Sequence, residues 1–361
     1  MTYCRTVRDC VQEHGVAVEI VSNFDLDWMG AWRAVRSVDL VHLNSHHLPL
    51  ALFARLQGKP LVIKYHYPLW DEIHRLEHEP RKLPARVMAN LLFNWKISAP
   101  DPWSLRLRFV LDRFLRSLLR VTLAGLASKR LACSASVAKA ADLPAPIEVE
   151  HNLHRFDLPS GEPERAGFLY AGRLHPDKGV DLLLEAAALL KQRGRVFAVA
   201  IAGTGQEEER LRERMAALGL QDVVEFVGPL TTADLQRRML AAACVVVPSR
   251  WNDPAPYVIL EAAAAACCVI GAERGGIPEL LGDAGLLFTC GDIAGLAGHM
   301  ARVLDQSDEA QRRGEALRDR LQSRCGAQIA APRLAAMYRS LASRSARVAP
   351  GEAPQPAQAE G

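Results

Sequence analysis

The sequence predicts an α/β protein with two parallel sheets, and three observations support this fold class. Short β-branched runs alternate with longer amphipathic patterns along the chain, which is typical of parallel sheets covered by helices on both faces. The length of 361 residues exceeds what one ordinary hydrophobic core serves, so two domains are expected. A polar segment with Pro and Gly, residues 157–165, separates two series of strands and is the predicted linker.

The first series forms a predicted domain over residues 1–156. It opens with a helical pattern at Tyr3–His14. Five strand-like runs follow, and they are expected at Val16–Val21, Leu40–Leu43, Leu61–Tyr65, Arg130–Cys133 and Ile147–Glu150. A basic and aromatic region, Arg81–Arg130, carries eleven Lys or Arg against two Asp. Its amphipathic helix, Leu105–Val121, would suit an anionic membrane surface, although the packing of an ordinary surface helix explains the same pattern.

The second series forms a predicted domain over residues 166–325. Its strands are expected at Phe168–Ala171, Phe197–Ala202, Val223–Val227, Cys244–Pro248, Val269–Gly271 and Leu286–Phe288. Its helices are expected at Gly179–Gln192, Glu207–Leu218, Ala233–Ala242, Tyr257–Ala266, Ile293–Leu304 and Gln311–Leu321. A C-terminal helix should occupy 326–342. The tail 343–361 is rich in Ala, Pro, Gln and Gly and is predicted to be disordered, because it cannot bury a core.

The cysteines and the apolar runs of the sequence indicate the cellular compartment in which the protein is expected. The eight cysteines show no zinc-type C-x-x-C spacing, and several lie in apolar runs, so they are interpreted as buried free thiols in a reducing environment. No signal-peptide pattern and no apolar run long enough to span a bilayer is present. The sequence therefore predicts a cytoplasmic protein, with peripheral contact to the inner face of a membrane left open.

Two strand-to-helix turns carry features that suit a phosphorylated ligand. The first, residues 171–179, places Gly172, Arg173 and Lys178 where a strand ends and a helix begins. Ligands of open α/β sheets bind at such strand ends, and two cations there suit a diphosphate, although a solvated loop would look the same. The second turn contains Gly203 and Gly205, which would let the backbone approach a ligand closely.

A third element, Pro248–Glu261, places two carboxylates eight positions apart. Pro256 suits the first helical position, so the amides of Tyr257 and Val258 would be free to meet an anion. Glu261 stands in an apolar stretch and needs a partner, which a sugar hydroxyl would supply; capping and salt bridging are the alternative. A glycine-rich loop, Glu273–Glu279, follows.

These four motifs, in this order and spacing, resemble the family 4 glycosyltransferases. The resemblance covers the second half of the chain closely and the first half in outline. It implies the GT-B fold, in which two Rossmann-like domains face each other across a cleft. It also implies a retaining transfer of sugar from a nucleotide-sugar donor, such as a UDP- or GDP-sugar, without metal or other cofactor. The acceptor would be a glycan, a lipid-linked molecule or a small molecule.

The resemblance also implies residue roles. Arg173 and Lys178 would hold the donor diphosphate and stabilise it as the leaving group. Asp253 would bind hydroxyls of the transferred sugar, and Glu261 those of the ribose. His66, at the end of a strand of the first domain, would face the cleft near the transferred sugar. The other predicted donor-binding residues are Gly172, Gly203, Gly205, Gly228, Leu230, Tyr257 and Val258.

The sequence departs from the family pattern in three places. Asp253 replaces the commoner Glu, and Pro256 stands where many members have Gly. The strand and Gly-rich loop that usually open the first domain are also missing. We therefore expect the natural protein to start roughly 15–30 residues earlier.

Several patterns leave alternatives open. His74-x-x-Glu77-His78 matches a zinc-protease motif without a third ligand, and Asp25-x-Asp27 matches a metal motif at chance frequency. His46 and His47 suit structure and substrate binding equally. Two other functions remain possible on the same fold: a non-hydrolysing nucleotide-sugar epimerase, and an inactive glycosyltransferase-like partner subunit.

Overall fold

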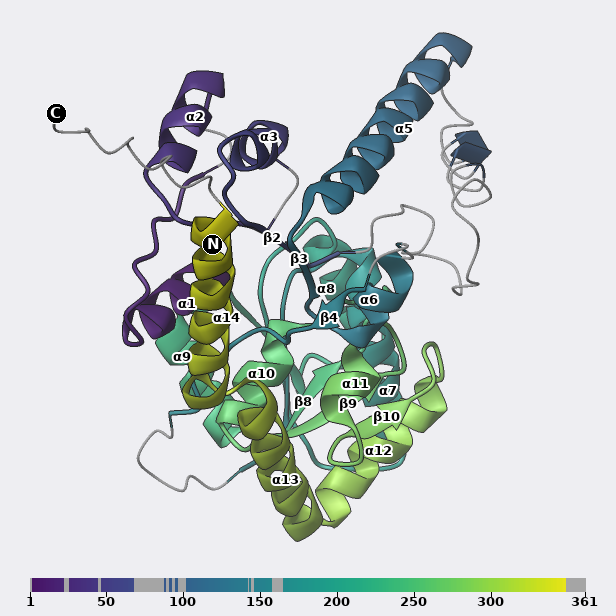
Figure 1. Ribbon diagram of the computed structural model, residues 1–361. Coiled ribbons are helices and arrows are strands. Elements are labelled where there is room, and N and C mark those ends of the chain that lie inside the picture. Colours follow the sequence, from purple (N-terminus) through teal and green to yellow (C-terminus); the bar gives the residue numbers. More distant parts are fainter. Residues whose placement is uncertain are drawn as a thin grey trace, which may run out of the picture.

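The computed structural model describes residues 2–22, 26–44, 47–67, 88, 91–92, 95–96, 102–141, 143, 146–157 and 165–348. It contains two parallel sheets, one in each half of the chain, with helices packed around them (Figure 1). The α/β class with two parallel sheets is therefore confirmed.

The N-terminal domain is built on a four-stranded parallel sheet in the order β1-β2-β3-β4. Its strands are β1 (Val41–Leu43), β2 (Leu61–Tyr65), β3 (Lys129–Ala132) and β4 (Glu148–Val149). Its helices are α1 (Thr2–Gln12), α2 (Trp28–Arg36), α3 (Leu48–Leu56), α5 (Trp103–Leu126) and α6 (Ala135–Ala141). All five residues of β2 are buried, as expected for an inner strand covered on both faces.

Two of the ambiguous sequence patterns are helix caps. The Oδ1 atom of Asp27 accepts a hydrogen bond from the amide of Gly30 and caps α2. The Nδ1 atom of His47 accepts one from the amide of Leu50 and caps α3. These roles account for both side chains within the fold. Asp25, His46 and the His74–His78 motif lie outside the described residues.

The strand predicted at Val16–Val21 is wrong. The segment has no regular secondary structure and belongs to neither sheet. Val16 and Val18 pack against a small core between α1 and the C-terminal helix, whereas Ile20 and Val21 are exposed. The apolar alternation of this segment therefore arises from its packing against helices and not from pairing with a neighbouring strand.

The C-terminal domain contains a six-stranded parallel sheet in the order β10-β9-β8-β5-β6-β7. Its strands are β5 (Phe168–Ala171), β6 (Val199–Ala202), β7 (Val224–Gly228), β8 (Cys244–Val247), β9 (Cys268–Ala272) and β10 (Leu286–Phe288). Its helices are the 3-10 helix η2 (Pro176–Lys178), α7 (Val180–Gln192), α8 (Glu208–Ala217), α9 (Thr232–Ala241), α10 (Tyr257–Ala264), α11 (Ile277–Leu281), α12 (Ile293–Asp305) and α13 (Ser307–Cys325).

The strand order of this sheet reverses around β5. The first strand, β5, pairs with β6 on one side and with β8 on the other. In open parallel sheets, ligands bind beyond the carboxyl ends of the strands at such a switch point. The loops after β5, β6 and β8, which contain three of the four sequence motifs, therefore lie where a ligand is expected.

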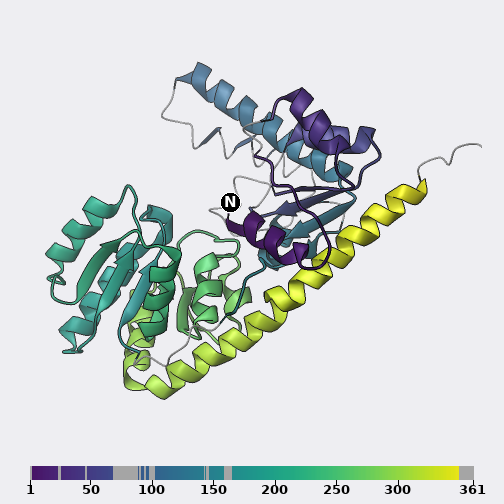
Figure 2. The same cartoon turned by 90° about the vertical axis from the view of Figure 1, so that its left-hand side faces the viewer.

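A long final helix, α14 (Ala327–Val348), follows α13 and runs from the C-terminal domain along the N-terminal domain (Figure 2). Arg333 on this helix donates two hydrogen bonds to Glu150, at 3.1 and 2.8 Å. The Tyr338 hydroxyl lies 2.6 Å from His42 Nδ1. The helix continues through residues 343–348, so the prediction of disorder from 343 is wrong for this stretch; the remainder of the tail lies outside the described residues.

The cysteines form no disulfide. All eight are free, and six of them are buried: Cys10, Cys133, Cys244, Cys267, Cys268 and Cys325. This agrees with their interpretation as thiols in apolar surroundings.

Candidate functional site

A cleft of about 620 Å³ lies between the two domains. The N-terminal domain contributes residues that follow β2, β3 and β4, namely His66, Tyr67, Cys133 and Asn152. The C-terminal domain contributes the loops after β5, β6, β7 and β8. Ten of the twelve predicted site residues line it: His66, Gly172, Arg173, Lys178, Gly203, Leu230, Asp253, Tyr257, Val258 and Glu261.

Lys178 is the cation of the cleft whose side-chain contacts are best defined. Its Nζ atom forms an ion pair with Asp253 Oδ2, and it lies 5.3 Å from the centre of the Trp251 ring. Both ends of the pair are largely shielded from water, with side-chain exposures of 20% for Lys178 and 8% for Asp253. A shielded ion pair is screened only weakly by salt, so the contact between these two side chains persists at physiological ionic strength.

Arg173 supplies a second cation, which is exposed. Its carbonyl accepts a hydrogen bond from the Tyr170 hydroxyl at 2.8 Å, which fixes the turn after β5. No ion pair of its guanidinium occurs among the residues described. Among the described residues, the cleft therefore presents Lys178 as a paired cation and Arg173 as a cation without an ion pair.

The start of helix α10 forms another part of the cleft wall. Pro256 is the N-cap, one residue earlier than its expected place at the first helical position, and no side chain caps the helix. The first amides, those of Tyr257 and Val258, lack carbonyl partners within the helix and line the cleft. Such a helix start favours an anion.

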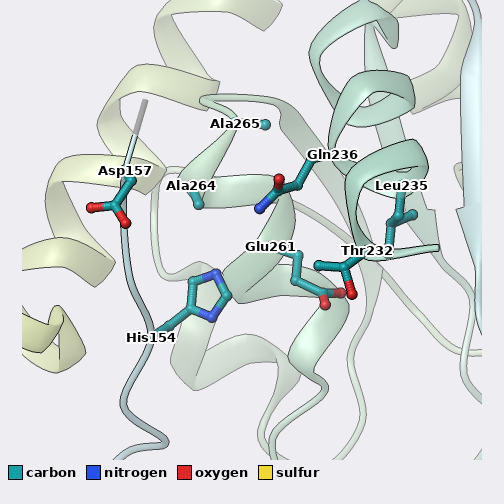
Figure 3. Close-up of a pocket in the computed structure, with 8 residues that line it drawn as sticks. All are labelled: His154, Asp157, Thr232, Leu235, Gln236, Glu261, Ala264 and Ala265. Carbon is teal, nitrogen blue, oxygen red and sulfur yellow. The ribbon is translucent and has the colours of Figure 1, made fainter. Parts of the chain in front are cut away.

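Glu261 is half-buried on α10, and burial raises the pKa of its carboxyl group. No hydrogen-bond partner of this carboxylate is present among the described side chains. It borders both the main cleft and a small cavity of about 40 Å³ formed with His154, Thr232 and Gln236 (Figure 3). A half-buried carboxylate without a partner is destabilising unless a ligand donates to it.

His66 faces the cleft as a neutral side chain. Burial first, and then the charges of Lys64 and His42, lower its pKa to about 3. Its Nε2 atom lies 3.0 Å from Asn44 Oδ1, an acceptor, so in the neutral ring this nitrogen carries the proton. Nδ1 is then the acceptor atom of the ring, which suits a hydroxyl donor.

The two predicted residues that do not line the cleft are Gly205 and Gly228. A Cβ at Gly205 would lie 2.1 Å from the Leu174 carbonyl oxygen, so this position needs glycine for a close approach of two loops. Gly228 accepts a hydrogen bond from the amide of Gly203 at 2.8 Å. Both glycines shape the loops behind the cleft surface.

The fourth motif holds the Asp253 loop in place. A Cβ at Gly276 would lie 2.0 Å from the Pro254 carbonyl oxygen, and the amide of Gly276 donates to the Asp253 carbonyl at 2.8 Å. Glu279 Oε2 accepts a hydrogen bond from the amide of Ala135 in the N-terminal domain at 2.7 Å. This motif therefore connects the cleft loop to the opposite domain.

Sequence reasoning missed two aromatic residues and one amide. Trp251 and Tyr67, from opposite domains, stack with ring centres 6.0 Å apart. The Oδ1 atom of Asn152 is buried at the cleft without a hydrogen-bond partner among the described residues. All three follow a strand end, and that position was the available signal. Among the described residues no group of three His, Cys, Asp or Glu could hold a metal ion.

The fold and the site together define a class of protein. Two parallel α/β domains that close a cleft with their strand ends form the GT-B architecture. Residues 155–320 match the family model described as glycosyl transferases group 1. The C-terminal half of the chain is therefore similar to the members of this family.

The curated relatives match mainly the same half of the chain. The glycogen synthase of Mycobacterium tuberculosis strain H37Rv is 34% identical over 175 residues, which are 48% of this chain and 42% of that protein. The D-inositol 3-phosphate glycosyltransferase of Streptomyces bingchenggensis is 32% identical over 183 residues, which are 45% of this chain and 40% of that protein. The chain thus matches less than half the length of either relative.

Solved structures match over both domains. HepE of Anabaena, crystallised with UDP, has a TM-score of 0.66 at 20% identity and covers 92% of this chain and 88% of its own. The sucrose-phosphate synthase of Thermosynechococcus elongatus has a TM-score of 0.64 at 20% identity, covering 90% and 81%. At this identity the likeness establishes the fold alone. In the described part of the chain, no helix is long and apolar enough to cross a membrane.

Proposed function

We propose that this protein is a retaining, metal-independent glycosyltransferase that uses a nucleotide-sugar donor, such as a UDP- or GDP-sugar. The supporting observation is that three features meet in one cleft: the Lys178–Asp253 ion pair, the start of α10 and Glu261. Within the described part of the chain, no side chain caps that helix start and none pairs with Glu261. A diphosphate needs cations and amides, and sugars need carboxylate acceptors. The cleft supplies both within one wall.

In the proposed complex, the diphosphate lies against Lys178, Arg173 and the amides of Tyr257 and Val258. Glu261 accepts hydrogen bonds from the ribose hydroxyls, which relieves the cost of its burial. Asp253 gives one carboxylate oxygen to Lys178 and keeps Oδ1 for a hydroxyl of the transferred sugar. His66, on the opposite wall, accepts from another sugar hydroxyl.

The reaction breaks the bond between the anomeric carbon and the diphosphate oxygen, and a new bond forms to the acceptor oxygen. The electron pair of the broken bond goes to the leaving diphosphate, which also takes the proton of the acceptor hydroxyl. Charge on the diphosphate therefore grows in the transition state. Lys178, Arg173 and the α10 start are fixed before reaction, so they stabilise this charge without reorganising.

The acceptor is proposed to be a glycan or lipid-linked molecule, with the enzyme in the cytoplasm and peripheral at the inner face of a membrane. The basic and aromatic region 81–130 supports this proposal, because Lys and Arg near a bilayer are attracted to anionic lipids.

The test is an assay of nucleotide release from a panel of UDP-, GDP- and ADP-sugars, with and without an acceptor lipid extract. A transferase releases nucleotide faster when the acceptor is present. An epimerase changes the sugar without net release, and an inactive partner subunit does neither. Either of the last two outcomes would replace the proposed function.

A further inference from the structure

Helix α5 carries an exposed apolar stripe. Its 24 residues have only three buried members, Ser117, Leu123 and Ala124. Leu107, Leu111, Leu115 and Leu118 are all about half exposed, at 53–54%. At 100° per residue these leucines fall within an arc of about 80°. Such a stripe on an outer helix face marks an interaction surface.

A second apolar patch lies at the same end of the molecule. On α2, Trp28 and Met29 are more than half exposed, and Trp28 and Trp32 both pack edge-on against Phe53 of α3. Helices α2, α3 and α5 all lie at the end of the N-terminal domain remote from the C-terminal domain (Figures 1 and 2). We call the α5 leucines together with Trp28 and Met29 the distal face.

Charge distinguishes the possible occupants of the distal face. Helix α5 contains five arginines against one aspartate, Asp112, which is paired with Arg116. Helix α2 adds two more arginines in its last turn, Arg33 and Arg36. A second copy of this chain would bring these like charges together, which is unfavourable. Anionic lipid headgroups complement them, and exposed tryptophan suits the interface between headgroups and acyl chains.

We propose that the distal face docks on an anionic lipid bilayer, with the α5 leucines at the boundary of headgroups and acyl chains. The binding itself is independent of the donor cleft. Its consequence rests on the proposed function: an enzyme held in this way takes an acceptor anchored in the same bilayer. This narrows the acceptor class to lipid-linked molecules.

The test is co-sedimentation of the full chain with vesicles of phosphatidylcholine alone or with one-third phosphatidylglycerol. The double variant Leu111→Gln/Leu115→Gln removes half of the stripe from exposed positions of the helix. The matched control, Val196→Gln/Ile329→Gln, removes two exposed apolar side chains elsewhere. We expect the wild type and control to bind the anionic vesicles, less tightly with added salt, and the α5 variant to bind ~10-fold or more weakly.

Absence of wild-type binding to anionic vesicles, or equal binding of both double variants, would overturn the proposal. So would light scattering that shows a wild-type dimer dissociated by Leu111→Gln/Leu115→Gln, since the face would then be a self-interface. UDP and GDP binding, measured on the same samples, keeps the two proposals separate. Vesicle binding without nucleotide binding would contradict the proposed function and leave the docking face in place.

Discussion

Lys178 and Asp253, 75 positions apart in the sequence, form an ion pair in the lining of the cleft. Lys178 follows β5 and Asp253 follows β8, the two strands that meet at the switch point of the C-terminal sheet. Parallel pairing places the two loops side by side. The fold thereby brings into contact the cation proposed to bind phosphate and the carboxylate proposed to bind the transferred sugar.

Replacing Lys178 with Ala should lower turnover more than it weakens nucleotide binding. The phosphate charge grows in the transition state, so kcat should fall ~100–1,000-fold while the dissociation constant of UDP or GDP changes less than about tenfold. Steady-state kinetics and calorimetry measure the two effects. Lys191→Ala, which removes an exposed cation paired with Asp222, is the matched control. An unchanged kcat together with a weakened nucleotide affinity would place Lys178 in ground-state binding only.

Replacing Glu261 with Gln should weaken nucleotide binding and stabilise the empty protein. A hydrogen bond to a charged group is worth about 1.5–3 kcal/mol, so affinity should fall at least tenfold. Burial raises the pKa of Glu261, so the folded chain binds more protons there than the unfolded chain and loses stability as pH rises through that pKa. The variant should therefore melt at a higher temperature at pH 8, and this gain should shrink towards pH 5.

The matched control for that pair of measurements is Glu213→Gln, on the exposed side of α8. Unchanged nucleotide affinity in folded Glu261→Gln would remove this carboxylate from the donor site. A higher melting temperature alone would then reflect burial without function.

Histidine protonation should destabilise the protein in mild acid. Burial lowers the pKa of His154 to about 4, against an ordinary value of 6.5. The unfolded chain binds this proton first, so its contribution to stability is complete above pH 6.5 and is lost as pH falls to about 4. Urea unfolding of His154→Gln should show a pH slope flatter than that of the wild type across this window, by up to about 3 kcal/mol in total. Parallel slopes for the two proteins would contradict the lowered pKa of His154. The variant His14→Gln is the control for loss of a histidine elsewhere in the chain.

Breaking the contact between Arg333 and Glu150 should destabilise the attachment of α14 to the N-terminal domain. Glu150 is 7% exposed and accepts both hydrogen bonds from the guanidinium of Arg333. Arg333→Gln therefore leaves a buried carboxylate without the charge partner that offsets its desolvation. Because Arg333 is itself half exposed, we expect a loss of about 1–3 kcal/mol in the free energy of unfolding. Arg312→Gln, on the exposed side of α13, should change stability by less than about 0.5 kcal/mol.

The sequence could predict those parts of the structure that depend on local pattern. The strand at Phe168–Ala171 and the helix that begins at Tyr257 lie where periodicity placed them. The strand prediction for Val16–Val21 was wrong because apolar alternation does not show which element a segment packs against. Here the segment packs against a pair of helices. The Arg333–Glu150 contact spans 183 positions, and no local pattern encodes it.

In the candidate site, too, the features that depend on local motifs could be predicted, whereas those that depend on tertiary contacts could not. Lys178, Asp253 and Glu261 stand in recognisable motifs, so their common cleft could be anticipated. Trp251 lies inside one of those motifs, yet its role depends on Tyr67 of the other domain, which only the folded structure brings near. Glu279 was part of a motif, but its hydrogen bond to Ala135 depends on how the domains meet.

The most direct test of a nucleotide-sugar donor site in this cleft is isothermal titration calorimetry of UDP and of GDP into the wild type and into Glu261→Ala. We expect a saturable isotherm for one of the two nucleotides with the wild type, and a dissociation constant raised tenfold or more in the folded variant. Absence of binding by either nucleotide to the folded wild type, or equal affinity in the variant, would contradict a donor site in this cleft.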